Sequence, residues 1–302
     1  MLEGKKILVT GPTGQVALPL TLSLCANNDV WGTARFSDAA KRQQLEAAGV
    51  TCVALDLGTG EFEDLPTDFD YVLNLAVARA NDADFDADLR ANAESVGLLM
   101  AHCRNAKAFL HCSSTAVYHP KGRQPIFETD PLGDNHRVMM PTYSIAKIAA
   151  EAVARTAARQ FDLPTVITRL NTPYGNNGGW MYYHLLMMKN GVEIPVHSDG
   201  PSVYTPIHED DINAAFPALL EHASTPALTV NVCGQEHVSI EEWCEYMAEL
   251  CGLEAKIAPT DQTLESVVSD SSKLQSLVGP AKVGWQEGLR RMIEARHPDW
   301  LV

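Results

Sequence analysis

The chain has 302 residues, of which 46% are hydrophobic, and its formal net charge is −15. This size suits one large α/β unit or two closely joined domains, and the excess of negative charge argues against nucleic acids and anionic membranes as partners. The seven cysteines form no Cys-x-x-Cys pair, and the chain shows no signal-peptide pattern, no membrane-length apolar run and no histidine spacing typical of a metal site. We therefore expect a cytoplasmic protein without a bound metal.

Up to residue 175, short apolar runs alternate with helical patterns. We predict strands at 5–10, 30–34, 52–55, 71–75, 108–112 and 165–170, and helices at 15–27, 38–48, 84–105 and 142–161. Strands that alternate with helices need crossover connections. The predicted fold class is therefore α/β, with a doubly wound parallel Rossmann sheet.

After residue 175 the rhythm changes. We predict helices at 180–188, 210–221 and 239–250, the last with Ser239 as its N-cap, and a strand at 229–233 that returns to the sheet. The chain is accordingly divided into a dinucleotide-binding domain of residues 1–175, to which 207–235 returns, and a smaller, interleaved substrate-binding domain of residues 176–206 and 236–302.

A glycine-rich turn directly follows the first predicted strand. Gly11 and Gly14 allow the backbone to approach a pyrophosphate, and the helix after them presents its N-terminal amides to the phosphates. A Gly-x-x-Gly turn also occurs in ordinary βα units, but here it opens a long strand–helix alternation. The predicted cofactor contacts in this turn are Gly11, Thr13, Gly14, Gln15 and Val16.

The end of the second strand normally meets the adenosine ribose, where a carboxylate would bind the 2′-hydroxyl of NAD. Here the strand ends in Arg35, which favours the 2′-phosphate of NADP, although a solvated surface arginine is the competing interpretation. We expect NADP, with NAD as the alternative cofactor. Asp56 and Leu57, after the third strand, are placed to contact the adenine.

Tyr143 and Lys147 lie four residues apart at the start of a helical pattern, so they share a helix face. A free tyrosine titrates near pH 10. A lysine ammonium at about 4 Å attracts the phenolate by on the order of 4 kcal/mol at an effective dielectric of roughly 20, which favours tyrosine as an acid/base. The apolar strand at 108–112 runs into the hydroxyl residues Ser113, Ser114 and Thr115, and a serine at this strand end can hold a substrate oxygen. Coincidental spacing and a simple turn cap are the competing interpretations.

Together these residues resemble the extended short-chain dehydrogenase/reductases, the NAD-dependent epimerase/dehydratase group. The resemblance covers nearly the whole chain and also includes the segments 74–76, 113–118, 169–175 and 208–212. It implies Tyr143 as general acid/base, Lys147 as its electrostatic partner and Ser114 as the catalytic hydroxyl. It further implies cofactor contacts from Leu75, Ala76, Val77, Asn92, Ser113, Tyr143, Lys147 and Thr172. Arg79 is interpreted as a surface residue, with a contact to a phosphate or to an acid group of the substrate as the alternative.

Three departures from that family narrow the expected substrate. Tyr204 occupies the position of an arginine that reaches the diphosphate in nucleotide-sugar members, and Thr115–Ala116 replaces the acid pair of the 4,6-dehydratases. The substrate side is also rich in methionine and aromatic residues, for which packing in a domain core is the favoured interpretation. We therefore expect a small, non-nucleotide substrate, with candidate contacts from Ser114, Thr115, Met140, Trp180 and Tyr204.

The main hypothesis is an NAD(P)-dependent oxidoreductase that interconverts a secondary alcohol and a ketone. A nucleotide-sugar epimerase with tightly held NAD and a non-catalytic dinucleotide sensor are the alternatives. The resemblance also implies a homodimer formed through 84–105 and 142–161, although the alanines of the second helix could equally pack within the monomer. The substrate, the direction and the stereochemistry of the reaction stay open.

Overall fold

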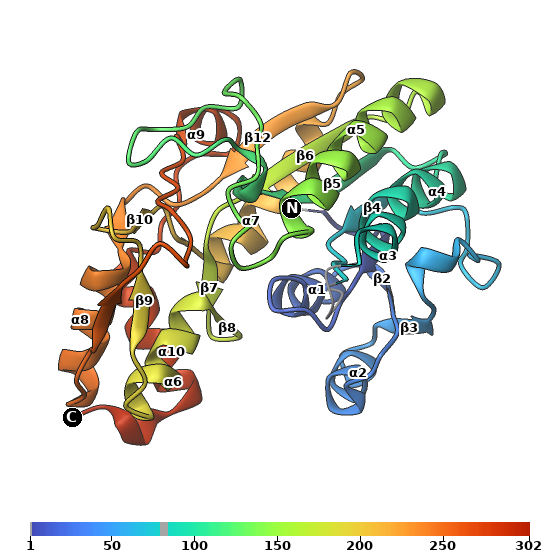
Figure 1. Ribbon diagram of the computed structural model, residues 1–302. Helices are drawn as coiled ribbons and strands as arrows, with labels where there is room; N and C mark the ends of the chain where they lie inside the picture. Colours follow the sequence, from blue (N-terminus) through green and yellow to red (C-terminus); the bar gives the residue numbers. More distant parts are fainter. Residues whose placement is uncertain (1, 79–83) are drawn as a thin grey trace.

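The computed structural model describes residues 2–78 and 84–302, so Arg79 lies outside the described residues. Its centre is a seven-stranded sheet in the order β12-β6-β5-β4-β1-β2-β3, and every pairing in it is parallel (Figure 1). The strands are β1 Lys6–Thr10, β2 Asp29–Ala34, β3 Thr51–Ala54, β4 Tyr71–Asn74, β5 Ala108–Ser114, β6 Thr165–Leu170 and β12 Leu228–Val232.

The sheet is doubly wound. From the central β1 the chain runs through β2 to β3 at one edge, then crosses back to β4 and continues through β5 and β6 to β12 at the other edge. The strand order therefore reverses between β1 and β4, and open α/β sheets bind ligands at the carboxyl ends of the strands at such a point. This arrangement confirms the predicted fold class.

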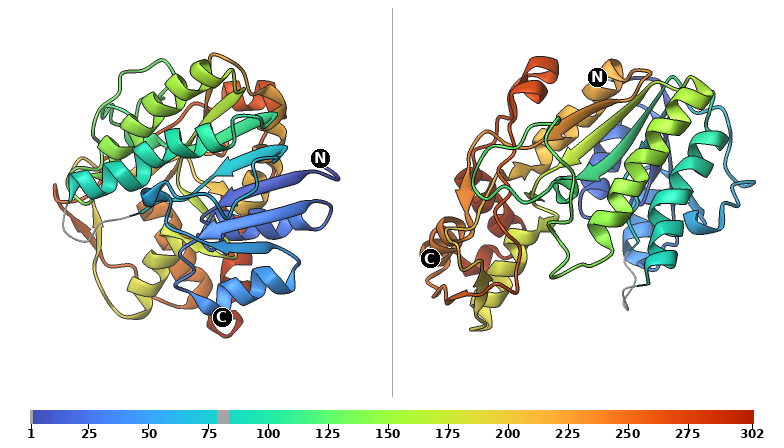
Figure 2. Two further views of the ribbon diagram at one scale, coloured as in Figure 1. Left: turned by 90° about the vertical axis from the view of Figure 1, so that its right-hand side faces the viewer. Right: turned by 45° about the horizontal axis from the view of Figure 1, so that its top comes forward.

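Helices cover both faces of the sheet. One apolar core lies against α1 (Ala17–Cys25), α7 (Glu209–Leu219) and α9 (Ser272–Val278), and another lies against α4 (Ser95–His102) and α5 (Tyr143–Phe161). Figure 2 shows α4 and α5 side by side across the sheet, whereas α2 (Ala39–Ala47) packs near the β3 edge. Because each central strand is covered on both sides, its sequence is a nearly continuous apolar run rather than an alternating one.

The helix predicted at 84–105 is interrupted. It consists of α3 (Phe85–Leu89), a π-helical segment at Arg90–Glu94 and α4. The π segment contains Asn92, whose side chain bonds the backbone of Ala78 and also donates to the carbonyl of Asp88 on its own helix. Single π turns often accompany functional sites, and this one holds the loop that follows β4.

A smaller lobe lies at one end of the molecule and carries the C-terminus (Figure 1). Its core is formed mainly by α6 (Trp180–Lys189), α8 (Ile240–Cys251) and α10 (Trp285–Arg296). Ser239 caps α8 in a capping box with Glu242, as predicted for the cap. Short strands complete the lobe and its junction with the sheet: β7 Pro173–Gly175, β8 Gly178–Gly179, β9 Ile194–Val196, β10 Val203–Tyr204, β11 Ile207–His208, β13 Val238–Ser239 and β14 Ile257–Pro259.

One part of the expected division into domains differs from the packing. Leu274 of α9 belongs to the core under the large sheet, although 236–302 was assigned to the smaller domain. The helix lies beside β12, and its apolar side chains are buried there rather than in the lobe. Among the described residues, no helix combines the length and the apolar character that crossing a bilayer requires.

Candidate active site

The glycine turn is tightly packed against the loop after β4. Gly11 has φ +64°, and a Cβ at this position would lie 2.8 Å from the Cα of Ala76. Only glycine accepts both the left-handed backbone and the close approach. The amide of Gly14 donates to the carbonyl of Gly11 over 2.9 Å, which closes the turn ahead of α1.

Beneath this turn, polar side chains link the ends of β1, β4 and β5. The hydroxyl of Thr10 accepts the amides of Leu75 and Ala76 at 3.1 and 3.0 Å and donates to Asn74 Oδ1 at 2.7 Å. The amide of Asn74 in turn lies 3.2 Å from His111 Nδ1. Burial, aided by the Lys147 ammonium, lowers the pKa of His111 to about 3, so this histidine is neutral.

These contacts fix residues 75 and 76 beside Gly11, at the point where the strand order reverses. The glycine cradle, which a Cβ would fill, and the N-terminal end of α1 fit the pyrophosphate of a dinucleotide. Val16 is the N-cap residue of α1. Gly11, Gly14, Leu75 and Ala76 are therefore brought together as the sequence predicted.

Gln15 contacts the β7–β8 hairpin of the smaller lobe. Its amide lies 3.4 Å from the carbonyl of Gly178, and the side chain of Asn177 donates to the carbonyl of Gln15 at 2.7 Å. The backbone of Asn177 donates to Glu209 at 3.0 Å, and burial raises the pKa of that carboxyl group. The hairpin thus lies directly on the predicted cofactor turn, a contact between residues that are far apart in the sequence.

Two cations lie near the end of β2. Arg35 is exposed, and Lys41 Nζ donates to the carbonyl of Thr13 in the glycine turn at 3.1 Å. Asp38, the nearest acid along the chain, is the N-cap of α2 and accepts the amide of Lys41 at 3.1 Å. Asp56, after β3, is exposed and accepts the amide of Gly58 at 2.9 Å, and Leu57 beside it is half-buried.

Tyr143 and Lys147 occupy the first two turns of α5. Tyr143 is half-buried, whereas Lys147 is only 5% exposed. Lys147 Nζ donates to the carbonyl of Cys112 at 2.8 Å and lies 6.0 Å from the centre of the Tyr143 ring. The lysine is therefore held between the end of β5 and the tyrosine, in the arrangement that the four-residue spacing predicted.

The three hydroxyl residues after Cys112 have different surroundings. Ser114 is half-buried and its hydroxyl accepts the amide of Ala116 at 3.1 Å. Ser113 is buried and donates to Glu151 at 2.7 Å, so its hydroxyl is directed toward α5 rather than toward the glycine turn. Thr115 is also buried. Any contact of Ser113 with a cofactor would thus involve its backbone, and Ser114 is the accessible hydroxyl.

Two residues near Tyr143 were not identified from the sequence. The ring of His136 lies 5.6 Å from that of Tyr143, and the neighbouring Asn135 donates to the carbonyl of Thr115 at 3.0 Å. This loop therefore connects the segment after Ser114 with the start of α5. No motif marks the pair; a histidine shortly before the tyrosine is the one signal that could have suggested it.

Two candidate substrate contacts, Tyr204 and Trp180, pack against each other in the smaller lobe. Tyr204 is 3% exposed, and its hydroxyl donates to the carbonyl of Glu265 at 2.8 Å. Its ring packs against Trp180 and Trp243, with centroids 5.0 and 6.0 Å apart. Tyr204 thus lies in the core of the smaller lobe, which differs from the expected substrate contact and agrees with the core interpretation of the aromatic residues. Trp180 is half-buried and packs against that core, so its contact with a substrate stays a prediction.

The remaining predicted residues lie around the two sites. Asn92 accepts the amide of Ala78 at 2.8 Å, which makes it a support for the loop after β4, and Val77 in that loop is exposed. Thr172, with φ +21°, donates to Asn171 at 2.9 Å just after β6. The carbonyl of Met140 accepts the amide of Tyr143 at 3.1 Å. Their contacts with cofactor or substrate stay predictions.

The fold and this site define a class: an α/β protein with a dinucleotide turn and a tyrosine–lysine pair at adjoining strand ends. The model of the NAD dependent epimerase/dehydratase family matches residues 7–234. The chain belongs to that family and is a nicotinamide-dependent enzyme, which confirms the family and the enzyme class predicted from the sequence.

Two curated relatives show the range of the similarity. The chain is 26% identical over 213 residues to the trifunctional UDP-glucose 4,6-dehydratase/UDP-4-keto-6-deoxy-D-glucose 3,5-epimerase/UDP-4-keto-L-rhamnose-reductase RHM3 of Arabidopsis thaliana, a match over 64% of this chain and 30% of that protein. It is 23% identical to the uncharacterized UDP-glucose epimerase YtcB of Bacillus subtilis, over 90% of this chain and 92% of that one. The chain thus matches under a third of the length of the plant relative.

Solved structures share the fold. The UDP-glucuronic acid 4-epimerase of Bacillus cereus, in complex with UDP-glucuronic acid and NAD, superposes with a TM-score of 0.84 at 22% identity, over 96% of this chain and 98% of that one. The dTDP-glucose 4,6-dehydratase DesIV of Streptomyces venezuelae, with NAD bound, gives 0.84 at 18% identity over 98% of both chains. At these identities the comparison establishes the architecture.

Proposed function

We propose that the protein oxidises and reduces a secondary alcohol carbon of a nucleotide-linked sugar, in the manner of a nucleotide-sugar epimerase. The observation that carries this proposal is the buried Lys147, whose Nζ donates to the carbonyl of Cys112, two residues before Ser114, and lies 6.0 Å from the centre of the Tyr143 ring. The two relatives and the two solved structures described above all have names that refer to sugar nucleotides, which supports the substrate class. This proposal replaces the small non-nucleotide substrate expected from the sequence, which the comparisons do not support.

In this proposal Tyr143 moves the proton and Ser114 orients the reacting oxygen. On oxidation, the alcohol proton passes to the Tyr143 oxygen, while the Ser114 hydroxyl holds the substrate oxygen by a hydrogen bond. The positive charge of Lys147 favours the tyrosine anion that accepts the proton. The nicotinamide ring, when the dinucleotide is bound, supplies the acceptor and donor of the hydride.

The cofactor would lie across the carboxyl ends of β1 and β4, with its pyrophosphate over Gly11 and Gly14. The exposed Arg35 and the Lys41 ammonium give the ribose end a positive charge, so we propose that the site accepts NADP as well as NAD. Structural neighbours with bound NAD support NAD as a cofactor. Titration of cofactor-free protein with NADH and NADPH tests this point: an NADPH affinity at least equal to that for NADH is expected, and binding of NADH alone contradicts it.

Tyr204 is the observation that favours a second candidate, a secondary alcohol without a nucleotide. Because the aromatic ring is buried in the lobe core, this position offers no cation for a diphosphate. A sugar nucleotide would then need its diphosphate partners from other loops. If that requirement is not met, the same Tyr143 chemistry would act on a smaller alcohol or ketone.

The two candidates are separated by a substrate panel. Purified protein with added NAD is incubated with UDP-glucose, UDP-glucuronic acid, dTDP-glucose and GDP-mannose, and the products are separated by anion-exchange chromatography. A new epimer or keto sugar that is absent with Tyr143→Phe supports the proposal. No reaction with these compounds, together with NAD(P)H-dependent reduction of a simple ketone, favours the second candidate.

We also propose that the smaller lobe, mainly 176–206 and 236–271, binds the substrate. Separately, we propose that the protein forms a homodimer through α4 and α5. Leu98 and Ile145 leave apolar side chains exposed on these helices. Ala150 and Ala154 face inward within the monomer, so the interface would use the outer face of α5. Light scattering at micromolar concentration tests the assembly, with a mass of one chain as the contradicting result.

A further inference from the structure

Polar residues recur at every fourth position along α5: Tyr143, Lys147, Glu151 and Arg155. Because an α-helix has 3.6 residues per turn, each step of four residues shifts the side chain by about 40° around the helix axis. The stripe formed by these four residues therefore winds slowly around α5. It runs from the half-buried Tyr143 through the buried Lys147 and Glu151 to the exposed Arg155. The proposed chemistry uses the first two residues and leaves the other two without a role.

Lys147 and Glu151 bind consecutive residues at the end of β5. Lys147 Nζ donates to the carbonyl of Cys112 at 2.8 Å, and the hydroxyl of Ser113 donates to Glu151 Oε1 at 2.7 Å. Both contacts immediately precede Ser114. The helix that carries Tyr143 is therefore joined to the strand that carries Ser114 by two hydrogen bonds at the strand's last residues.

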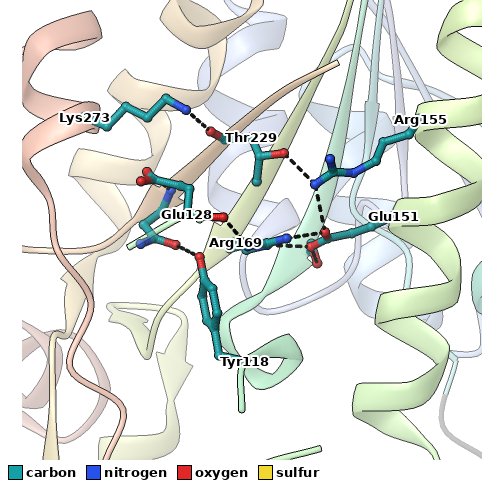
Figure 3. Close-up of polar contacts among 9 residues, drawn as sticks. Tyr118, Glu128, Glu151, Arg155, Arg169, Thr229 and Lys273 are labelled. Carbon is teal, nitrogen blue, oxygen red and sulfur yellow. Dashed lines mark hydrogen bonds and ion pairs between the residues drawn. The ribbon is translucent and has the colours of Figure 1, made fainter. Parts of the chain in front are cut away.

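Arg169 on β6 completes the attachment. Ser113 and Arg169 are direct partners in the β5–β6 pairing, so their side chains lie side by side beneath α5. Arg169 binds Glu151 through Nε at 2.9 Å and through Nη2 at 2.7 Å, and both side chains are almost fully buried (Figure 3). A bidentate pair of this kind fixes geometry as well as charge.

The same arginine also supports the segment after Ser114. Its guanidinium lies 4.7 Å from the centre of the Tyr118 ring and donates to the carbonyl of Glu128 at 3.1 Å. Tyr118 follows the short turn Thr115–Val117, and its hydroxyl donates to Asn231 on β12 at 2.5 Å (Figure 3). Ser114 therefore lies between two anchored residues, Ser113 before it and Tyr118 after it.

We propose that Glu151 is a positioning residue that sets the Ser114 hydroxyl relative to Tyr143. It acts directly through Ser113 and, through Arg169, on Tyr118. The inference rests on the proposed function for its use of Ser114 and Tyr143. A buried ion pair by itself could stabilise the fold without placing Ser114, so the Ser113–Glu151 hydrogen bond is the contact that separates the two roles.

Ser113→Ala removes that hydrogen bond and leaves the Glu151–Arg169 pair intact. Hydrogen exchange followed by mass spectrometry is measured on peptides covering residues 114–117, where the amide of Ala116 is bound to the Ser114 hydroxyl. Exchange there is expected to accelerate about tenfold. With the sugar nucleotide that the wild type converts, kcat is expected to fall about ten- to a hundredfold while KM changes about twofold or less.

Ser95→Ala is the matched control. Ser95 is also a buried serine with one hydrogen bond, to the carbonyl of Ala91 at 2.7 Å, but it lies on α4. The Ser95→Ala variant should change neither the hydrogen exchange of residues 114–117 nor kcat. If Ser113→Ala also leaves that exchange unchanged, the proposal is overturned, whichever substrate the protein uses.

A double variant separates positioning from stability. Glu151→Leu combined with Arg169→Met removes both buried charges together, so the melting temperature should stay closer to the wild-type value than in Glu151→Leu alone. If Glu151 positions Ser114, exchange at residues 114–117 stays fast and kcat stays low in the double variant. Recovery of both readouts with stability would assign the pair a structural role only. If the wild type converts no sugar nucleotide, the proposed function fails separately, and the exchange data still decide the positioning role.

Discussion

At the carboxyl ends of the central strands, polar side chains are held by short hydrogen bonds. Thr10 donates to Asn74 and accepts the amide of Ala76, and Lys147 donates to a backbone carbonyl of β5. The centre of the smaller lobe is filled differently, with the rings of Trp180, Tyr204 and Trp243 packed edge to face. In this aromatic cluster Trp243 Nε1 donates to His184 at 2.9 Å, and the Tyr204 hydroxyl donates to the carbonyl of Glu265 at 2.8 Å.

The difference indicates which parts of the two regions can bind a ligand. The strand ends carry a glycine cradle and the buried Lys147 cation, whereas the lobe centre is filled mainly by aromatic rings. We therefore propose that substrate contacts come from the loops of the lobe and from the segment before α5, where Met139 is exposed and its sulfur lies 3.8 Å from the Thr263 hydroxyl. Four variants and conditions test this division.

The largest effect is expected from Tyr143→Phe. Losing the proton-transfer hydroxyl should lower kcat by on the order of 10² to 10⁴, while dinucleotide affinity, measured by calorimetry, stays close to that of the wild type. Tyr183→Phe, at an exposed tyrosine on α6, serves as the control. Near-normal turnover in Tyr143→Phe would remove this residue from the mechanism.

Gly11→Ala should lower stability and cofactor binding more than Gly4→Ala, a glycine substitution outside the cradle. Gly4 has nearly the same backbone, φ +62° against +64°, but a Cβ there would meet nothing within 4 Å. Gly4→Ala should thus cost only the left-handed strain, about 1 kcal/mol. Gly11→Ala adds the clash with Ala76, so it should be less stable to urea than Gly4→Ala and bind NADH at least about tenfold more weakly. Equal losses in the two variants would contradict the cradle.

Acidification should destabilise the fold through two buried histidines. Burial lowers the pKa of His184 to about 4 and that of His111 to about 3, against 6.5 for an unburied group. As the pH falls below about 6.5, these histidines become protonated in the unfolded chain but stay neutral in the folded chain. Each histidine therefore lowers the free energy of unfolding by about 1.4 kcal/mol per pH unit until its folded pKa is reached.

Urea unfolding between pH 7 and about pH 4 measures this slope. His184→Gln should reduce the slope, whatever its stability at pH 7, whereas His222→Gln at the surface should not. An unchanged slope in His184→Gln would show that this histidine is not held neutral in the fold.

The smallest effect is expected from Tyr204→Phe. The change removes the hydroxyl that donates to the Glu265 carbonyl and keeps the ring packed in the lobe, so it should cost about 1 kcal/mol of stability. KM for the substrate should not change, because the hydroxyl lies in the lobe core. A several-fold rise in KM with unchanged stability would return Tyr204 to the substrate site.

The sequence predicted features that depend on residues close together in the chain and missed those that depend on contacts between distant elements. The glycine turn, the parallel strands and the Tyr143–Lys147 spacing are local patterns with strong backbone causes. The structure places the glycine turn at the switch point of the sheet and Lys147 at the carboxyl end of β5. The burial of Tyr204 depends on Trp180 and Trp243, on separate elements. An alignment on a nearby motif could therefore give its position but not its surroundings.

The same reasoning explains the contacts that were missed. Glu151 continues the four-residue stripe of Tyr143 and Lys147, but its role depends on Ser113 and Arg169, which lie on two other strands. The contact of Asn177 with Gln15 joins residues 162 positions apart. The π turn contains Asn92, which bonds Ala78 in the loop after β4, a contact that the apolar pattern does not encode, so that pattern predicted an unbroken helix.

The most direct test of the central claim is product analysis with sugar nucleotides, run with NAD on the wild type and on Tyr143→Phe. The account predicts that the wild type converts at least one UDP-, dTDP- or GDP-sugar to an epimer or a keto sugar, and that the variant binds NAD but forms no product. Conversion at similar rates by both proteins, or turnover restricted to alcohols without a nucleotide, would contradict it.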